Sequence, residues 1–387
     1  MNPAQHSSAA GRGFDVAVVG AGIVGLGAAY AAVRRGQSVV VIERGPEALG
    51  ATIRNFGHLC IGAQTGLARQ YADASRPLWI RLSRDAGFWL RESGTLVVAR
   101  HADEVALLEA AAREDGIDLL TARDFETQVS VLPGVAAGGA LITPDLQTDP
   151  RTAAAAIRTH LARLGVRFLT RTSAGAVRTG YVDTTRGRVD AGLVVVAVNH
   201  DLDQLLPDLA ESTGIVRCGL DMLRVRGDAA CIPAPLLTGW SLVRYGRFAG
   251  LPEAAAVRER LHAERPDLAA LDLNQMYTQL PDGSIIVGDT HHRGVGIAPF
   301  QAEAAADLLV EEFEALFGFR GAVMERWQGV YASGPDDFLV AEPEPEVVVL
   351  AATTGIGMTT GLGLAETVLA PRLGAAAQAL NSEGSPA

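Results

Sequence analysis

The fold of this chain is decided by residues 14–57, FDVAVVGAGIVGLGAAYAAVRRGQSVVVIERGPEALGATIRNFG. Two apolar runs, Phe14–Gly20 and Ser38–Ile42, have the length and composition of buried strands. Between them, three glycines with G-x-G-x-x-G spacing open an alanine-rich helix: Gly20, Gly22 and Gly25. The second strand ends on an acid, Glu43. A strand, a glycine turn, a helix, a second strand and a terminal acid in this order predict a dinucleotide site.

Each part of this pattern has a physical role in holding a diphosphate. The first glycine allows the tight turn, the second lets the pyrophosphate approach the backbone, and the third seats the helix on the strand. The helix N-terminus at Ile23 and Val24 directs free N–H groups and a positive dipole end at the phosphates. Glu43 would accept hydrogen bonds from a ribose, with Arg44 beside it. The alternative is a structural turn without a ligand.

The continuation Gly50–His58, GATIRNFGH, resembles the G-A-[ST]-x-x-N-x-G loop of one flavoprotein superfamily. This is the D-amino-acid oxidase, glycine oxidase and sarcosine oxidase superfamily of FAD-dependent oxidoreductases, and the resemblance extends over most of the chain. In that family the loop runs under the flavin. The resemblance therefore implies FAD contacts for six loop residues: Ala51, Thr52, Asn55, Phe56, Gly57 and His58.

Two later segments complete the cofactor site that the resemblance implies. Val177 stands where the backbone of the family touches adenine. The turn Gly355–Thr360 would bring a helix N-terminus to the pyrimidine edge of the flavin, where the helix dipole stabilises negative charge. The implied contacts are Gly355, Ile356, Gly357, Met358, Thr359 and Thr360. An ordinary loop before a helix is the alternative for this turn.

The order of elements and the resemblance together predict an α/β (α+β) fold with two domains. A Rossmann-like FAD-binding domain would take residues 14–85, 145–212 and 325–387. A substrate domain on a large antiparallel sheet would take residues 86–144 and 213–324, and residues 1–13 would form a disordered tail. Within this plan Asp149-Pro150 is a helix start, and Pro281-Asp282-Gly283 is the turn of a hairpin.

Composition limits the partners and the compartment. The chain has 387 residues, of which 48% are hydrophobic, so it can bury a large core. A net charge of −11 argues against nucleic acid and anionic membranes as partners. No apolar run approaches the roughly 20 residues of a membrane helix, and the N-terminus lacks the apolar core of a signal peptide. The three cysteines are too scattered for a disulfide framework or a zinc motif, so we expect a cytoplasmic protein without a metal.

The chain contains no lysine, so all 33 basic residues are arginines. A pyridoxal-phosphate enzyme is thereby excluded, because it needs a Schiff-base lysine. Sarcosine-oxidase relatives use a lysine to promote reaction with oxygen, so the electron acceptor here stays open between oxygen and another molecule. Those relatives also tether FAD to a cysteine two residues before a tyrosine. Here Gly329 stands before Tyr331, so we expect non-covalent FAD.

The resemblance implies oxidation of a small primary or secondary amine by hydride transfer to flavin N5. The resulting imine would be hydrolysed by water to an aldehyde or keto product. Glycine-oxidase relatives hold the substrate carboxylate with an arginine just before the Asp-Gly turn, where this chain has Leu280. The missing arginine disfavours an ordinary α-amino acid.

Two short motifs, Arg54–His58 and Gly288–His292, look most like one branch of the superfamily. Its genes accompany phosphonate metabolism, and its suggested substrates are derivatives of 2-aminoethylphosphonate. A phosphonate dianion suits arginine forks and histidines. The candidate substrate-binding or charge-stabilising residues are Arg54, His58, His291 and His292. The alternative for His291 and His292 is that they belong to a solvated loop. The alternative for His58 is that it supports a ligand-binding residue through a hydrogen bond and does not contact the ligand itself.

Other functions stay open. A D-amino-acid or N-methyl-amino-acid oxidase of the sarcosine or glycine type could hold a carboxylate with another arginine, such as Arg244. A flavin electron-transfer subunit of a dehydrogenase complex is an alternative from another class, and the missing lysine favours it. A soluble NAD-dependent dehydrogenase would use the same fingerprint with a different cofactor.

Overall fold

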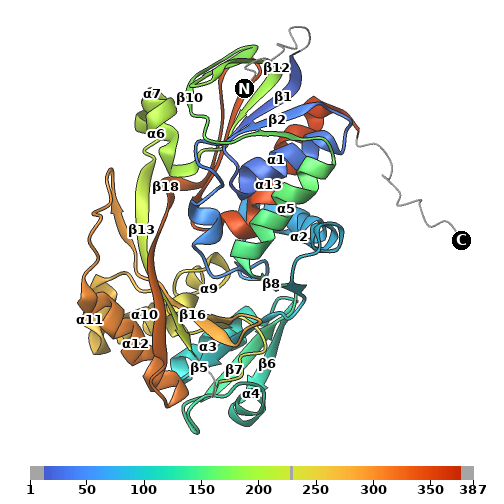
Figure 1. Cartoon of the computed structure of the whole chain (residues 1–387). Coiled ribbons are helices and arrows are strands. Elements are labelled where there is room, and N and C mark those ends of the chain that lie inside the picture. The colour runs from blue at the N-terminus through green and yellow to red at the C-terminus, as the bar shows by residue number, and fades with distance from the viewer. Residues whose placement is uncertain (1–12, 227–229, 376–387) are drawn as a thin grey trace, which may run out of the picture.

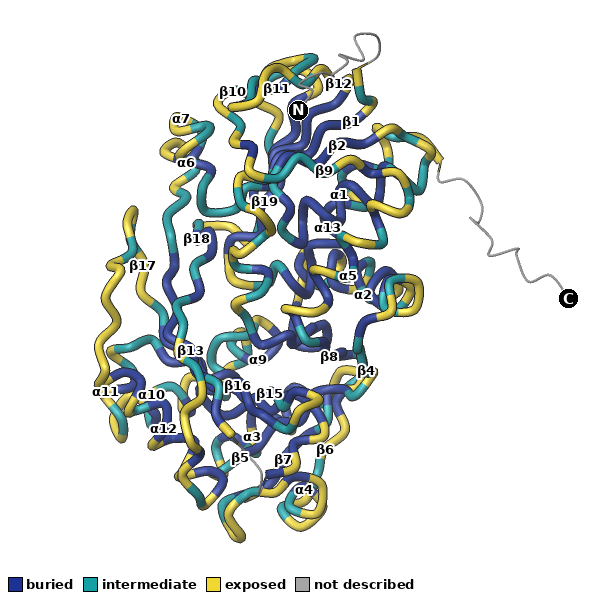
Figure 2. Tube along the Cα trace, in the orientation of Figure 1, coloured by how far each residue is buried: buried dark blue, intermediate teal, exposed yellow. Residues whose placement is uncertain are grey.

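Strand β1 (Phe14–Val19) is apolar at consecutive positions because both of its faces are covered. Val16 and Val18 pack in a cluster with residues of the neighbouring helices, whereas Ala17 and Val19 belong to a second cluster on the opposite face. The alternation follows from the two-residue period of a strand. In Figure 2, β1 and the strand labelled β2 beside it are coloured as buried. The computed structural model describes residues 13–226 and 230–375, so nearly all of the predicted tail lies outside it.

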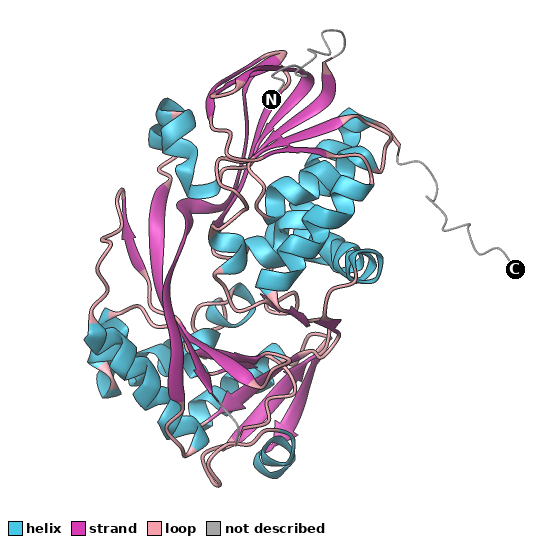
Figure 3. Cartoon of the chain, viewed as in Figure 1, coloured by secondary structure: helices cyan, strands magenta, loops and turns pink. Residues whose placement is uncertain are grey.

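Five parallel strands form the part of the sheet that contains the glycine turn. Their order is β19 (Val347–Thr354), β12 (Gly187–Val196), β1, β2 (Val39–Ile42) and β9 (Arg167–Leu169). Four helices gather beside one face (Figures 1 and 3): α1 (Ile23–Val33), α2 (Gly66–Ala86), α5 (Pro150–Arg163) and α13 (Gly357–Leu373). The opposite cluster is completed by β10 (Ala174–Arg178) and β11 (Tyr181–Thr184), followed by α6 (Leu202–Leu205) and α7 (Pro207–Ser212).

One long strand, β18 (Ala322–Glu344), joins the two halves of the molecule (Figure 1). Its first part pairs antiparallel with β13 (Val216–Arg226), and its last part pairs antiparallel with β19. The sheet therefore continues without a break from the parallel strands into an antiparallel half. The short strand β17 (His292–Gly294) pairs with the other edge of β13.

The antiparallel half supplies the second large core. Its remaining strands are β5 (Thr95–Ala99), β6 (Ile117–Thr121), β7 (Gly138–Ile142), β14 (Leu236–Leu237), β15 (Met276–Gln279) and β16 (Ser284–Gly288). Its helices are α3 (Ala102–Ala111), α4 (Ala122–Gln128), α8 (Gly239–Leu242), α9 (Gly246–Ala249), α10 (Ala254–Glu264), α11 (Pro266–Ala270) and α12 (Glu303–Phe317). A small sheet of β3 (His58–Leu59), β8 (Leu146–Thr148) and β4 (Leu90–Arg91) lies apart from it.

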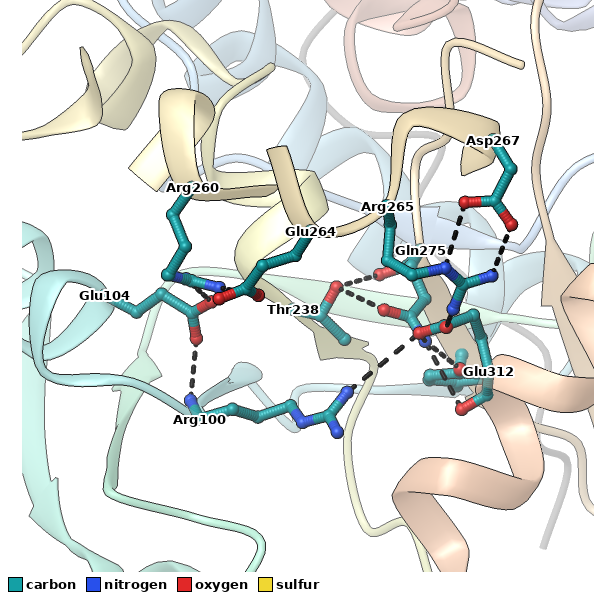
Figure 4. Close-up of polar contacts among 10 residues, drawn as sticks. Arg100, Glu104, Thr238, Arg260, Glu264, Arg265, Asp267, Gln275 and Glu312 are labelled. Carbon is teal, nitrogen blue, oxygen red and sulfur yellow. Dashed lines mark hydrogen bonds and ion pairs between the residues drawn. The ribbon is translucent and has the colours of Figure 1, made fainter. Parts of the chain in front are cut away.

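Two buried acids tie the helices of this half to one another and to the segment before β15 (Figure 4). Glu312 of α12 pairs with Arg265 and accepts a hydrogen bond of 3.2 Å from the Gln275 side chain. Glu104 of α3 pairs with Arg260 of α10 at 2.6 Å. Because Gln275 precedes β15, the Glu312 cluster fixes the segment that enters the candidate site described below.

The predicted α/β fold class is confirmed, with a large sheet that is mostly antiparallel beyond the five parallel strands, the pair β14–β5 being parallel. The predicted helix start is also confirmed, since Asp149 accepts a 3.0 Å hydrogen bond from the Arg151 N–H and Pro150 opens α5. The division into two discontinuous domains stays a prediction. Within the described part of the chain, we find no helix with the length and apolar character that a membrane crossing demands.

Candidate active site

A cavity of about 1180 Å³ opens at the carboxyl ends of β1 and β2 and extends under the antiparallel half. It is larger than the roughly 300–1,000 Å³ typical of a small-ligand pocket. Carboxyl ends of parallel strands are where α/β sheets bind ligands. The cavity can therefore hold a dinucleotide together with a small second molecule.

The glycine turn has the geometry that the spacing predicts. Gly20 has a φ of +101°, and a Cβ there would lie 2.5 Å from the Ala197 carbonyl oxygen. A Cβ on Gly25 would lie 2.0 Å from the Gly20 carbonyl oxygen, so only glycine lets α1 start this close to β1. Gly20, Gly22, Ile23 and Val24 line the cavity, whereas Gly25 seats the helix behind it.

The terminal acid is held ready for a ligand. One Glu43 oxygen accepts a 3.0 Å hydrogen bond from the Ala21 N–H, and the other accepts a 2.8 Å bond from the Gly45 N–H. Each carboxylate oxygen can accept a further bond, which fits the hydroxyl groups of a ribose. Arg44 also lines the cavity and pairs with Asp201 at 2.7 Å.

The predicted adenine contact at Val177 involves its backbone and stays a prediction. Val177 is 2% exposed and belongs to a hydrophobic cluster rather than to the cavity lining. The lining at this end comes instead from the residues just before it: Thr172, Ser173 and Ala174. In the β10 strand Val177 points its side chain into the core, so at most its backbone faces a ligand.

The loop after β2 is fixed by its own side chains. Thr52 Oγ1 accepts a 2.9 Å hydrogen bond from the Ile23 N–H and so joins the loop to the start of α1. Asn55 donates to the carbonyls of Ala51 and Thr52 and accepts from the Gly57 N–H at 2.8 Å. The cavity is lined by Ala51, Thr52, Arg54, Asn55, Phe56 and His58, whereas Gly57 packs behind the loop against Thr148.

The C-terminal turn reaches the same cavity from the other side. Gly355, Ile356, Gly357, Met358 and Thr359 line it, and Thr360 lies behind, bonding the Ile356 carbonyl at 2.9 Å. Thr359 Oγ1 accepts a 3.0 Å bond from the Cys60 N–H, which links this turn to the loop. The N-terminus of α13 therefore faces the cavity and favours negative charge there.

His58 is held by two buried residues that the sequence did not single out. The Thr95 hydroxyl donates to Asp145 Oδ2 at 2.7 Å, so it can only accept from His58 Nε2, which lies 2.6 Å away. The hydrogen of the His58 ring is thereby assigned to Nε2. His58 Nδ1 is left as an acceptor, and it is buried without a partner in the described residues. Asp145 Oδ1 accepts from the N–H groups of Ile61 and Gly62.

His58, Cys60 and Asp145 are also the one group of possible metal ligands found in the described ranges, with ligand atoms within 4.8 Å of one another. The hydrogen bonds of Asp145 and His58 account for this clustering without an ion. Burial raises the pKa of the Cys60 thiol well above its usual value, so the sulfur is held in its weaker, protonated ligand form.

The far end of the cavity contains two arginines that share one carboxylate. Arg244 Nη1 and Arg293 Nη1 donate to the two oxygens of Asp272, at 2.5 and 2.6 Å. His291 Nδ1 donates to the Asp272 carbonyl at 2.9 Å. Burial and the charge of Arg244 lower the pKa of His291 to about 3, so this histidine is uncharged near neutral pH.

Asp289 lies beside this cluster as a buried carboxyl group in the cavity lining. Its Oδ1 accepts a 3.0 Å hydrogen bond from the Asn274 side chain. Burial raises the pKa of Asp289 to about 7, although Arg244 and Asn274 act in the opposite direction. Asp289, Asn274, Asp272 and Arg293 were all missed by sequence reasoning, because each acquires its role from a partner in a distant segment.

The four predicted substrate residues do not converge. His58, Arg54 and His291 line the cavity, and Arg54 Nη1 bonds the Gln328 carbonyl at 3.2 Å. His292 lies outside it, half exposed, with Nε2 3.1 Å from Asp221. Neighbouring residues of an extended segment point to opposite sides, so His291 and Arg293 face the cavity and His292 does not.

A three-glycine turn, an acid at the end of the second strand and a polar pocket beyond them are the features of an enzyme that binds a dinucleotide. Residues 15–370 match the family model described as FAD dependent oxidoreductase, and the chain belongs to this family. Its cofactor is accordingly FAD, which the glycine turn and Glu43 fit. Among curated proteins, no significant match exists.

Solved structures share the fold at low sequence identity. Glycine oxidase from Geobacillus kaustophilus has a TM-score of 0.73 and 19% identity, covering 93% of this chain and 95% of its own. L-proline dehydrogenase from P. horikoshii has a TM-score of 0.74 and 19% identity, with coverages of 92% and 91%. L-alpha-glycerophosphate oxidase from Mycoplasma pneumoniae, with FAD bound, has a TM-score of 0.72 and 17% identity, with coverages of 93% and 94%.

Proposed function

We propose that this FAD-dependent oxidoreductase oxidises a small primary or secondary amine that carries an anionic group. The observation that supports it best is the pair Arg244 and Arg293 on the shared carboxylate of Asp272. Two guanidinium groups and one carboxylate leave an excess of one positive charge at the end of the cavity. An anion at this place would be held by the N–H groups that Asp272 does not use.

A phosphonate is the anion that we favour, in keeping with the motifs Arg54–His58 and Gly288–His292. Its three oxygens can accept from both arginines at once, in the geometry that suits guanidinium forks. His291 is uncharged, so it would add no charge to the site. A carboxylate fits the same pair, so oxidation of an amino acid or N-methyl amino acid is the second candidate, with Arg244 as its clamp.

FAD supplies a two-electron acceptor when bound. The residues of the chain orient the substrate: the arginine pair holds the anion, and the fixed loop from Ala51 to His58 keeps the cofactor side of the cavity rigid. The electron acceptor of the second half-reaction is oxygen or another molecule. Comparing peroxide formation with reduction of a dye would distinguish an oxidase from a dehydrogenase or an electron-transfer subunit.

The test is anaerobic mixing of the FAD-loaded protein with 2-aminoethylphosphonate, its N-methyl derivative, sarcosine and D-alanine. Bleaching of the flavin absorbance is expected first with the aminophosphonates. Arg244→Met should raise the KM for the reactive amine by about 10- to 100-fold, because charge-assisted hydrogen bonds contribute ~1.5–3 kcal/mol. Arg224→Met is the matched control, since Arg224 bonds Ser284 and Asp282 outside the cavity. Bleaching by none of these amines would contradict the proposal.

A further inference from the structure

Three hydrogen-bond acceptors lie on residues beside the arginine pair, and none has a donor in the part of the chain that the structure describes. They are Asp289 Oδ2, Asn274 Oδ1 and His291 Nε2. Asn274 Oδ1 is buried, and an unsatisfied buried acceptor costs ~1–3 kcal/mol. All three residues line the cavity, and their free acceptors suit a ligand rich in N–H donors.

Asn274 and Asp289 form a fixed pair. The Asn274 N–H donates to the Asp289 carbonyl at 2.8 Å, and the Asp289 N–H donates back to the Asn274 carbonyl at 2.6 Å. The Asn274 side-chain nitrogen donates to Asp289 Oδ1, which turns Asn274 Oδ1 away from the carboxylate. This amide oxygen is buried without a partner, although Asn274 lines the cavity. Both side chains are therefore positioned before any ligand arrives.

His291 contributes an acceptor because of its other nitrogen. Nδ1 bonds a carbonyl oxygen, which can only accept, so Nδ1 carries the hydrogen and Nε2 keeps its lone pair. Nε2 lies 3.9 Å from Asp289 Oδ2. One nitrogen can donate to both atoms over this separation, because N–H···O and N–H···N bonds are each about 2.9 Å long.

We propose that Asp289, Asn274 and His291 bind the ammonium group of the substrate, and that Asp289 accepts one of its protons. This inference rests on the proposed amine oxidation. In the step one N–H bond of the ammonium breaks and one O–H bond forms on Asp289, so that a neutral amine and a neutral carboxyl group result. No electrons change hands in this step. The free amine has the nitrogen lone pair that removal of hydride from the adjacent carbon requires.

The surroundings of Asp289 suit a proton acceptor. The charged and titratable groups around it are Arg244, Asp272, His291, Tyr245, Tyr331 and Cys218. Burial raises the pKa of the carboxyl group to about 7, near the pH at which a general base works best. The neighbouring arginine pair would hold the anion of the same substrate, so the cavity fits a zwitterion.

The experiment is the pH dependence of anaerobic flavin reduction in the wild type, Asp289→Asn and Asp221→Asn. Asp221 is a matched control, because it is a buried carboxylate of the same sheet that bonds Thr290 and His292 outside the cavity. At pH 7, Asp289→Asn should slow reduction by about 100- to 10,000-fold, the usual range for general-base removal. The loss should shrink above pH 9, where the amine is increasingly deprotonated in solution. An Asp289→Asn protein with the wild-type pH profile would overturn the inference while leaving amine oxidation intact.

A second measurement does not need turnover or a folded variant. An amine without hydrogen on the carbon next to nitrogen, such as 2-amino-2-methylpropylphosphonate, can bind but cannot be oxidised. Its binding to the wild type at pH 8 should produce the infrared band of a protonated carboxyl group, shifted in deuterated water. If Asp289→Asn fails to bind FAD, the wild-type spectrum decides: binding without this band overturns the inference.

Discussion

Replacing Asp145 should change both the stability of the protein and the hydrogen position on His58. Asp145 is fully buried and accepts three hydrogen bonds, from the Ile61 N–H at 2.7 Å, the Gly62 N–H at 2.6 Å and the Thr95 hydroxyl at 2.7 Å. Asp145→Ala leaves at least the two N–H groups unsatisfied, each at ~1–3 kcal/mol. We therefore expect the free energy of unfolding to fall by about 4 kcal/mol.

Asp145→Asn separates charge from geometry. The amide oxygen can still accept from Ile61 and Gly62, but the amide nitrogen now donates to Thr95. We expect the Thr95 hydroxyl hydrogen to turn to His58 Nε2, which moves the ring hydrogen to Nδ1. We expect the free energy of unfolding to fall by ~1.5–3 kcal/mol, the value of a hydrogen bond to a charged group. The free acceptor on the cavity side of His58 also disappears.

Urea unfolding at a fixed FAD concentration measures the first effect, because bound cofactor adds its own stability. Nitrogen-15 NMR of the imidazoles measures the second, and the chain has only 8 histidines to assign. Asp183→Asn serves as the control, since Asp183 forms an exposed pair with Arg188 and should cost less than about 0.5 kcal/mol. An Asp145→Asn protein whose His58 keeps its hydrogen on Nε2 would refute this reasoning.

Three further outcomes are expected. Gly25→Ala places a Cβ 2.0 Å from the Gly20 carbonyl oxygen, so α1 must shift away from β1. The affinity for FAD, measured by fluorescence titration, should fall at least about 10-fold. Unchanged affinity would contradict the close packing of α1 on β1. Glu312→Ala leaves Arg265 and the Gln275 amide without a buried acceptor, so the free energy of unfolding in urea should fall by about 2 kcal/mol. Asp267→Asn changes the exposed side of Arg265 and should lower it far less. Asp289, with its folded pKa raised to about 7, contributes stability that is lost as pH rises toward 7. His291, with its folded pKa lowered to about 3, contributes stability that is gained as pH rises toward 6.5, so the two nearly cancel. In Asp289→Asn the free energy of unfolding should therefore increase with pH, by up to ~1.4 kcal/mol per pH unit between pH 4 and 6. In His291→Gln it should decrease with pH over the same range. Equal pH slopes in the wild type and both variants would show that these pKa shifts are absent.

The cofactor half of the site could be predicted because its signals are local. The turn at Gly20 and Gly25 depends on spacing within one strand and one helix, and Glu43 follows directly from the second strand. The Val177 contact stays a prediction, because its buried side chain does not decide whether its backbone meets the ligand. Thr172 and Ser173, a few residues earlier, carry no comparable pattern.

The substrate half depends on pairings between distant segments, which no local pattern reports. Arg217 and Arg224 lie on β13, yet they pair with Asp203 and Asp282 away from the cavity. Arg244 reaches the cavity just after α8 rather than from a strand. His291 and not His292 points into the cavity because alternate side chains of the segment after β16 face opposite sides. Which side each one faces is set by the pairing of β17 with β13.

The single strand β18 limits how the molecule can open. Its hydrogen bonds to β13 at one end and to β19 at the other tie both halves into one ladder. A hinge motion that closes the two halves over the cavity would have to break these hydrogen bonds. We therefore expect the two halves to move as one body. We then expect substrate to enter and product to leave past the loops at the cavity rim, which can shift while the ladder stays intact.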